Sequence, residues 1–272
     1  MIDHFSTGYV MPAISFVMSC LGCGVGLAAI ARAHIPRSRY RVLWLVLGGS
    51  AIGATGVWAM HFVALLGLAL EGARIRYDVA GTIMSLVVGA AALVVGAIVA
   101  DGAKGRNPRL LVGAAIAGLG LAASVHLGMG AIQVGLGVSL DYAPFLGILS
   151  YAAALLSALL VLWFANNLRS VSAGAGAMVL VAAALSGVHY IVMSSMSLHR
   201  VGTGPIPPST RGMAPEELVL PIAVGLAAAT LVLMVVLMAL PSAREIKAQA
   251  KFDEWRERNR ATVQQPVRSK LL

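Results

Sequence analysis

Long apolar segments alternate with short polar ones along almost the whole chain. An uncharged run of about 20 residues predicts a transmembrane helix, because 20 residues at a rise of about 1.5 Å cross a hydrocarbon core about 30 Å thick. Seven such runs are present, at about 9–31, 42–70, 79–100, 110–138, 143–165, 171–198 and 218–240. We therefore expect an all-α, polytopic membrane protein with seven transmembrane helices.

Polar residues dominate only at the carboxyl-terminal end. We expect a membrane domain over residues 1–240 and a basic cytoplasmic tail over 241–272. The composition agrees, since 59% of the residues are hydrophobic and only 11% are charged. The sequence contains no phosphate-binding loop, paired-carboxylate site or serine nucleophile motif, and the tail is too short for a cyclase, kinase or phosphodiesterase. We therefore expect that the chain is not an enzyme.

Basic residues indicate the orientation of the chain in the membrane. With an external N-terminus and a cytoplasmic C-terminus, 16 of the 20 Lys and Arg residues face inward. The positive-inside rule favours that orientation, and we expect it in the cell (inner) membrane. The basic residues lie at helix ends, where they face anionic lipid, so the net charge of +9 does not require a nucleic-acid partner.

Three histidines lie inside the predicted helices at a near-constant interval. His61, His126 and His189 are separated by 65 and 63 residues. That interval equals two membrane crossings, so the first six helices are interpreted as three helical-hairpin repeats followed by a seventh helix. The histidines then occupy parallel helices at similar depth, in the outer half of the membrane. An imidazole in hydrocarbon needs a partner, so we expect the three to converge on one functional site.

Methionines accompany these histidines. Met60 directly precedes His61. Met129 follows His126 by three residues and Met193 follows His189 by four, and these two spacings place the side chains on one helix face. Imidazole together with thioether suits a soft transition metal, and copper is the best match. A proton relay and hydrogen bonds between helices remain alternatives for the histidines, and gap filling remains one for the methionines.

These motifs resemble those of the MHYT-domain family of integral membrane sensor proteins, in which a Met-His-Tyr-Thr-Gly-Met type motif recurs three times at the outer ends of alternate helices. Met60-His61-Phe62 is similar to the first copy, His126 with Met129 is a looser second copy, and His189-Tyr190 with Met193 is similar to the third. Valine replaces the methionine before the second and third histidines, and Leu65 replaces the second methionine of the first copy. The resemblance covers nearly all of residues 1–240.

The resemblance implies a membrane sensor that binds copper through His61, His126, His189, Met60, Met129 and Met193 and responds to oxygen, carbon monoxide or nitric oxide. Such a sensor would signal through a separate cytoplasmic partner. Two alternatives stay open: a histidine-dependent proton or metal carrier, and an accessory protein for the assembly of a metalloenzyme.

Overall fold

The computed structural model describes residues 2–3, 8–35, 40–70, 75–103, 107–135, 138–167, 171–200, 211–239, 251–252, 255–256 and 258–259. By its internal contacts the chain divides into Met1–Ala229 and Thr230–Leu272, and the fold below is that of the first unit. Several basic residues used above to orient the chain lie outside the described residues: Arg37, Arg39, Arg74, Lys104, Arg106, Arg169 and most of those after residue 240.

Helices account for most of the described residues, as the apolar runs predict. The helices are α1 (Val10–Ala33), α2 (Arg41–Ser50), the π-helix η1 (Ala51–Ala59), α3 (Met60–Leu65), α4 (Val79–Val99), α5 (Pro108–Gly130), α6 (Pro144–Asn167), α7 (Val171–Ser194) and α8 (Pro215–Ala239). Because α2, η1 and α3 are continuous, they form one span. Among the described residues, six spans are long and apolar enough to cross a membrane, the last of them within α7.

Local sequence explains where two of these helices begin. Asp78 precedes α4, and its side chain accepts a hydrogen bond from the backbone N–H of Gly81 at 2.6 Å. Asn107 caps α5 in the same way, and Pro108 occupies the first turn. Capping side chains satisfy backbone donors that a helix leaves unpaired at its start, and proline is tolerated there.

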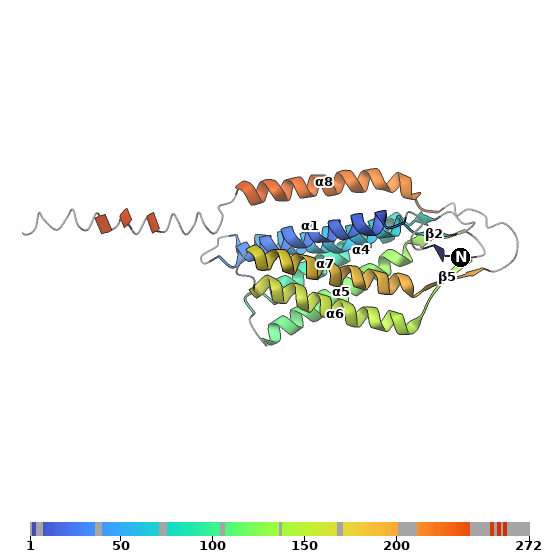
Figure 1. Cartoon of the computed structure of the whole chain (residues 1–272), viewed down its shortest axis with the longest axis horizontal. Coiled ribbons are helices and arrows are strands. Elements are labelled where there is room, and N and C mark those ends of the chain that lie inside the picture. The colour runs from blue at the N-terminus through green and yellow to red at the C-terminus, as the bar shows by residue number, and fades with distance from the viewer. Residues whose placement is uncertain are drawn as a thin grey trace, which may run out of the picture. The chain divides into compact units, whose positions relative to one another are not determined.

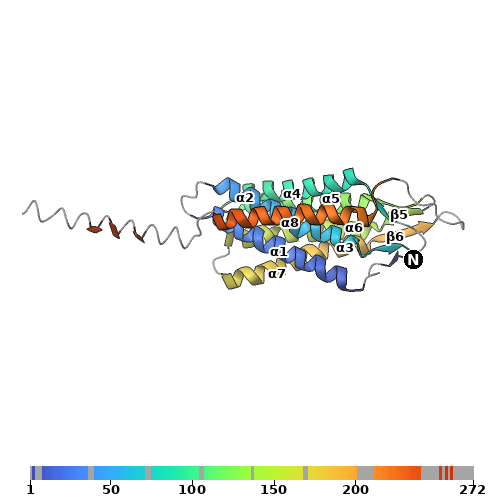
Figure 2. The same ribbon diagram turned by 90° about the horizontal axis from the view of Figure 1, so that it is seen from above.

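The six spans pack in chain order around a ring, because each contacts its neighbour in sequence and α7 returns to contact α1 (Figures 1 and 2). The three histidine-bearing spans also contact one another. They are the more buried ones: 61% of Arg41–Leu65 and 50% of each of the other two are buried, against 44% or less for the remaining spans. The second, fourth and sixth spans therefore form the inner part of the bundle.

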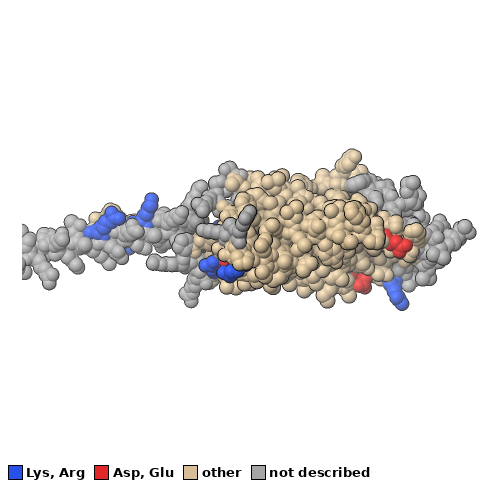
Figure 3. Space-filling model, turned by 90° about the horizontal axis from the view of Figure 1, so that it is seen from below, with Lys and Arg blue, Asp and Glu red and all other residues tan. Residues whose placement is uncertain are grey.

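Charged groups gather at the ends of the bundle rather than along its sides. The face of Met1–Ala229 shown in Figure 3 has a broad uncharged belt between charged ends. At one end, Asp101 accepts a hydrogen bond from Arg41 Nε at 2.6 Å and lies 3.1 Å from His34 Nε2. The next residue, Gly102, donates its backbone N–H to Asn166 at 3.0 Å. This cluster ties together the ends of α1, α2, α4 and α6.

At the opposite end the connections form short antiparallel strands rather than longer helices. The pairs are β1 (Ile2–Asp3) with β2 (Ala69–Leu70), β3 (Arg76–Tyr77) with β4 (Ile132–Gln133), and β5 (Val138–Tyr142) with β6 (Met196–Arg200). The labelled strands lie beside the N-terminus in Figures 1 and 2. The predicted helices 42–70, 110–138 and 171–198 were therefore too long. Apolar content alone does not distinguish the last turn of a helix from a short paired strand.

Candidate functional site

A π-helix leads into the first histidine. The hydroxyl of Ser19, on α1, donates to the carbonyl oxygen of Gly56, in η1, at 2.8 Å. A Cβ added to Gly22 would collide with the backbone of Gly56, so glycine allows α1 to approach η1 this closely. π-helical segments occur frequently at functional sites. Here the segment ends at Ala59, two residues before His61.

The structure brings two of the three predicted histidines together. His61 and His189 face each other with their Nδ1 atoms 2.7 Å apart and their ring planes at 82°. Both are buried, with 2% and 0% of their surfaces exposed. Each of the three histidines lies four or five residues before the strand-side end of its helix, so all occupy one level of the bundle.

The outer nitrogens of this pair have no hydrogen-bond partner. A neutral imidazole has one donor and one acceptor nitrogen, so a hydrogen bond between the two Nδ1 atoms leaves one ring with Nε2–H and the other with an Nε2 lone pair. Both Nε2 atoms are buried and unpaired, and so is Ser186 Oγ, which precedes His189 by three residues on α7. An unpaired buried polar group costs about 1–3 kcal/mol. A polar or metallic partner that binds these atoms would therefore stabilise the pair.

Gly128 on α5 closes the site on the side of His61. A Cβ added to this glycine would lie 2.5 Å from His61 Nε2, a distance that real Cβ atoms do not adopt. The absence of a side chain thus leaves the space that the imidazole occupies. The sequence indicated close packing around the histidines, but it did not identify this contact.

His126 lies apart from the pair. Its Nδ1 donates to the carbonyl oxygen of Ala122 at 2.8 Å, and its ring stacks on Tyr151 with centroids 5.0 Å apart. It lines a separate cavity of about 500 Å³ whose other polar residues are Asp78, Gln133 and Tyr151. Residues two apart on an α-helix point about 200° apart. Because Gly128 faces His61, His126 lies on a different face of α5, although it remains near enough to His61 for an electrostatic interaction.

The three predicted thioether residues are buried. Met60, Met129 and Met193 have 0%, 1% and 2% of their surfaces exposed. Met193 shares the face of α7 that carries His189. Met129 directly follows Gly128, the residue that lies against His61. Among the described residues, no group of three or more His, Cys, Asp and Glu side chains converges as a metal site. Imidazole and thioether are therefore the donors from which a metal site here would be built.

Aromatic residues that the sequence analysis did not single out support the site from its outer side. The hydroxyl of Tyr77 donates to the carbonyl oxygen of Leu65 at 3.2 Å, and its ring lies against Phe62, with centroids 5.4 Å apart. Burial raises the pKa of the Tyr77 hydroxyl, so the group stays neutral and continues to donate. Tyr77 belongs to a strand rather than a helix, so the spacing of apolar residues gave no signal for it.

Taken together, the fold and this site define a multi-pass helical membrane domain with a buried polar pair near one end. Residues 55–114 match the model of the MHYT family, which is described as "Bacterial signalling protein N terminal repeat". The matched region includes His61 and ends before His126. The family resemblance predicted from the motifs is therefore confirmed over residues 55–114.

One curated relative is the "Bifunctional diguanylate cyclase/cyclic di-GMP phosphodiesterase MucR" of Pseudomonas aeruginosa. The two chains are 28% identical over 195 residues, which cover 70% of this chain and 28% of the relative. The chain thus spans less than a third of that relative's length. No solved structure matches. The match to a signalling repeat, rather than to a catalytic domain, agrees with a membrane domain that serves signalling.

Proposed function

We propose that this chain is a sensory domain of the inner membrane that binds a copper ion through His61 and His189 and responds to a diatomic gas. The observation that carries the proposal is the buried imidazole pair, whose Nδ1 atoms face each other at 2.7 Å and whose Nε2 atoms lack partners. The Nε2 atoms lie on the far sides of the two rings, so an ion shared by both histidines would sit between the Nδ1 atoms, in place of the proton that they share, with the rings moved slightly apart. Binding to these buried nitrogens would stabilise the folded chain.

The donor chemistry favours copper over other biological metals. Imidazole nitrogens accept copper readily, and thioether sulfur prefers its reduced form. Met60, Met129 and Met193 are the candidate thioether donors, all of them buried near the level of the pair. Reduced copper supplies an affinity for oxygen, carbon monoxide or nitric oxide. We assign no copper to His126, because its Nδ1 is bonded to a carbonyl oxygen of its own helix and its ring stacks on Tyr151, in a cavity that neither His61 nor His189 lines.

The second span offers a path from this site to the other side of the membrane. His61 lies near one end of that span, and Arg41, which is bound to Asp101, lies at the other end. A gas ligand that favours one arrangement of the helices would shift the position of Arg41 and its neighbours, provided that its affinity differs between the two arrangements. The N-terminus is external in this proposal, α8 is a seventh crossing, and the tail is cytoplasmic.

The signal would then pass to a separate cytoplasmic partner. The relative named above carries diguanylate cyclase and cyclic di-GMP phosphodiesterase in its name. We therefore propose an enzyme of cyclic di-GMP metabolism as the class of partner.

The copper content of the purified full chain tests the metal proposal. Wild-type protein, loaded with copper under reducing conditions and freed of excess metal, is expected to retain stoichiometric copper. His61→Ala and His189→Ala should each lose most of it, whereas His126→Ala should retain it. The carbon monoxide stretching band of the reduced copper form, measured by infrared spectroscopy, should be present in the wild type and in His126→Ala alone.

Two outcomes would count against this assignment. Equal copper in the wild type and in a His61→Ala, His189→Ala double variant would remove the pair from the metal site. Loss of copper in His126→Ala equal to that in His61→Ala would instead restore a site that uses all three histidines.

A further inference from the structure

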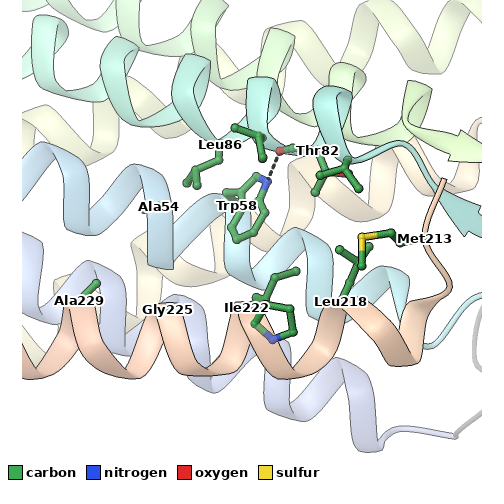
Figure 4. Close-up of a pocket in the computed structure, with 12 residues that line it drawn as sticks. Ala54, Trp58, Thr82, Leu86, Met213, Leu218, Ile222, Gly225 and Ala229 are labelled. Carbon is green, nitrogen blue, oxygen red and sulfur yellow. Dashed lines mark hydrogen bonds between the residues drawn. The ribbon is translucent and has the colours of Figure 1, made fainter.

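A second cavity lies along the side of the bundle, away from the His61–His189 contact. It has a volume of about 490 Å³ and is lined by η1, the first two turns of α4, Met213 and the first half of α8 (Figure 4). The indole of Trp58 extends from η1 toward this space, opposite Ile222 and Gly225 of α8.

The polar groups on the wall of this cavity are already paired. Trp58 Nε1 donates to the carbonyl oxygen of Thr82 at 3.0 Å and to Ser85 Oγ at 2.9 Å. The hydroxyl of Thr82 donates to the carbonyl oxygen of Asp78 at 2.7 Å. Trp58 and Thr82 are the polar side chains among the lining residues, and the others are apolar. A cavity without free polar groups does not hold ordered water, so its occupant must be apolar.

The surroundings of the cavity are apolar and exposed, as expected for a surface that faces hydrocarbon. Ile83 is 55% exposed on α4, and Leu220 and Val224 are 70% and 60% exposed on α8. The lining residues on α4 begin at its first residue, Val79, at the strand-bearing end of the bundle. The cavity therefore lies within the membrane span, on the same half as His61.

The size of the cavity selects among apolar occupants. A volume of about 490 Å³ is roughly 16 times the share of one water molecule in liquid water, about 30 Å³. A diatomic gas would leave nearly all of it empty, whereas a flexible chain of many methylene groups would fill it. Volumes of about 300–1,000 Å³ are typical of ligand pockets.

We propose that this cavity binds a hydrocarbon chain of a membrane lipid, which lies against Trp58. The site does not depend on copper at the histidine pair. Contact between the lipid chain and the indole would alter the surroundings of that pair, because Trp58 stacks on Phe62 with ring centroids 5.8 Å apart and Phe62 follows His61. Lipid composition is therefore a second input to the same end of the bundle.

Quenching of tryptophan fluorescence by brominated lipids tests the proposal. The full chain with Trp58 as its single tryptophan (Trp44→Phe, Trp163→Phe, Trp255→Phe) is reconstituted into phosphatidylcholine vesicles whose acyl chains carry bromine. Trp58 is only 8% exposed, so strong quenching requires a chain inside the cavity. Bromine on chain carbons close to the head group should quench more than bromine at the end of the acyl chain.

A plug variant and a matched control make the test specific. Gly225→Leu places an isobutyl group in the cavity, in a position with no neighbour within 4 Å, and should abolish most of the quenching. Gly147→Leu, also without neighbours but on α6, should leave it unchanged. Quenching that is equal in Gly225→Leu and its parent, or absent in the parent, would overturn the proposal. Should Gly225→Leu fail to fold, as judged by circular dichroism, the dependence on bromine position in the parent decides alone.

Discussion

At the scale of single residues, the histidine pair depends on a glycine as much as on its imidazoles. Gly128 lies against His61 Nε2, and any larger residue would occupy the position of the ring. The sequence could identify His61 and His189 as interior, because an imidazole in a long apolar run needs a partner. It could not separate His126 from them. That separation follows from the two-residue offset between His126 and Gly128, which only the packing of α5 reveals.

Substituting this glycine should damage the site, whereas a neighbouring glycine should tolerate the same change. In Gly128→Ala the new methyl group displaces the His61 ring and so disturbs its contact with His189, and overpacking of this kind costs about 1–3 kcal/mol. Gly130→Ala on the same helix is the control, because nothing lies within 4 Å of its added Cβ. Unfolding in a graded mixture of mild and denaturing detergent should show the loss for Gly128→Ala alone, and copper retention should fall with it. Equal stability of the two variants would contradict the close contact.

At the scale of elements, the sequence predicted where helices lie better than how they end. Apolar runs located all six described spans, because the bilayer requires about 20 apolar residues per helix. They did not reveal β5 and β6, whose residues pair from Val138 with Arg200 to Tyr142 with Met196. They also did not reveal η1, because its nine residues, Ala51–Ala59, are as apolar as the α-helical turns around them. Strand pairing depends on partners distant in sequence, which periodicity does not report, and apolar content does not distinguish a π-helical turn from an α-helical one.

The π-helix should depend on the hydrogen bond that it receives from α1. Ser19→Ala removes the donor to the Gly56 carbonyl oxygen. Hydrogen bonds between membrane helices contribute about 0.6 kcal/mol on average and roughly 1.7 at most, so a loss in that range is expected in detergent unfolding. Ser15→Ala on the same helix is the control, because the Ser15 hydroxyl bonds within α1 to the carbonyl oxygen of Pro12. A loss for Ser15→Ala as large as that for Ser19→Ala would argue that η1 gains nothing specific from α1.

At the scale of the whole molecule, the two ends of the bundle differ in construction. Strand pairs close the end near the histidines, while the Asp101 cluster joins four helices at the other end. The second span connects the two ends without interruption, from Arg41 to Leu65. A change at His61 can therefore reach the opposite end of the bundle through one continuous helical span. This arrangement suits a signalling domain only if the two ends face opposite sides of the membrane.

Accessibility of single cysteines should decide that orientation and whether α8 crosses the membrane. In a background with Cys20→Ser and Cys23→Ala, cysteine replaces Ser139 on β5, Asn167 at the end of α6 or Lys251 beyond α8. A membrane-impermeant maleimide applied to intact spheroplasts should label Ser139→Cys directly and the other two only after permeabilisation. The 16 basic residues that would face inward in this orientation favour this outcome, because their translocation across the membrane is unfavourable. Labelling of Lys251→Cys from outside would mean that α8 does not cross the membrane. Protection of Ser139→Cys would mean that the bundle has the opposite orientation.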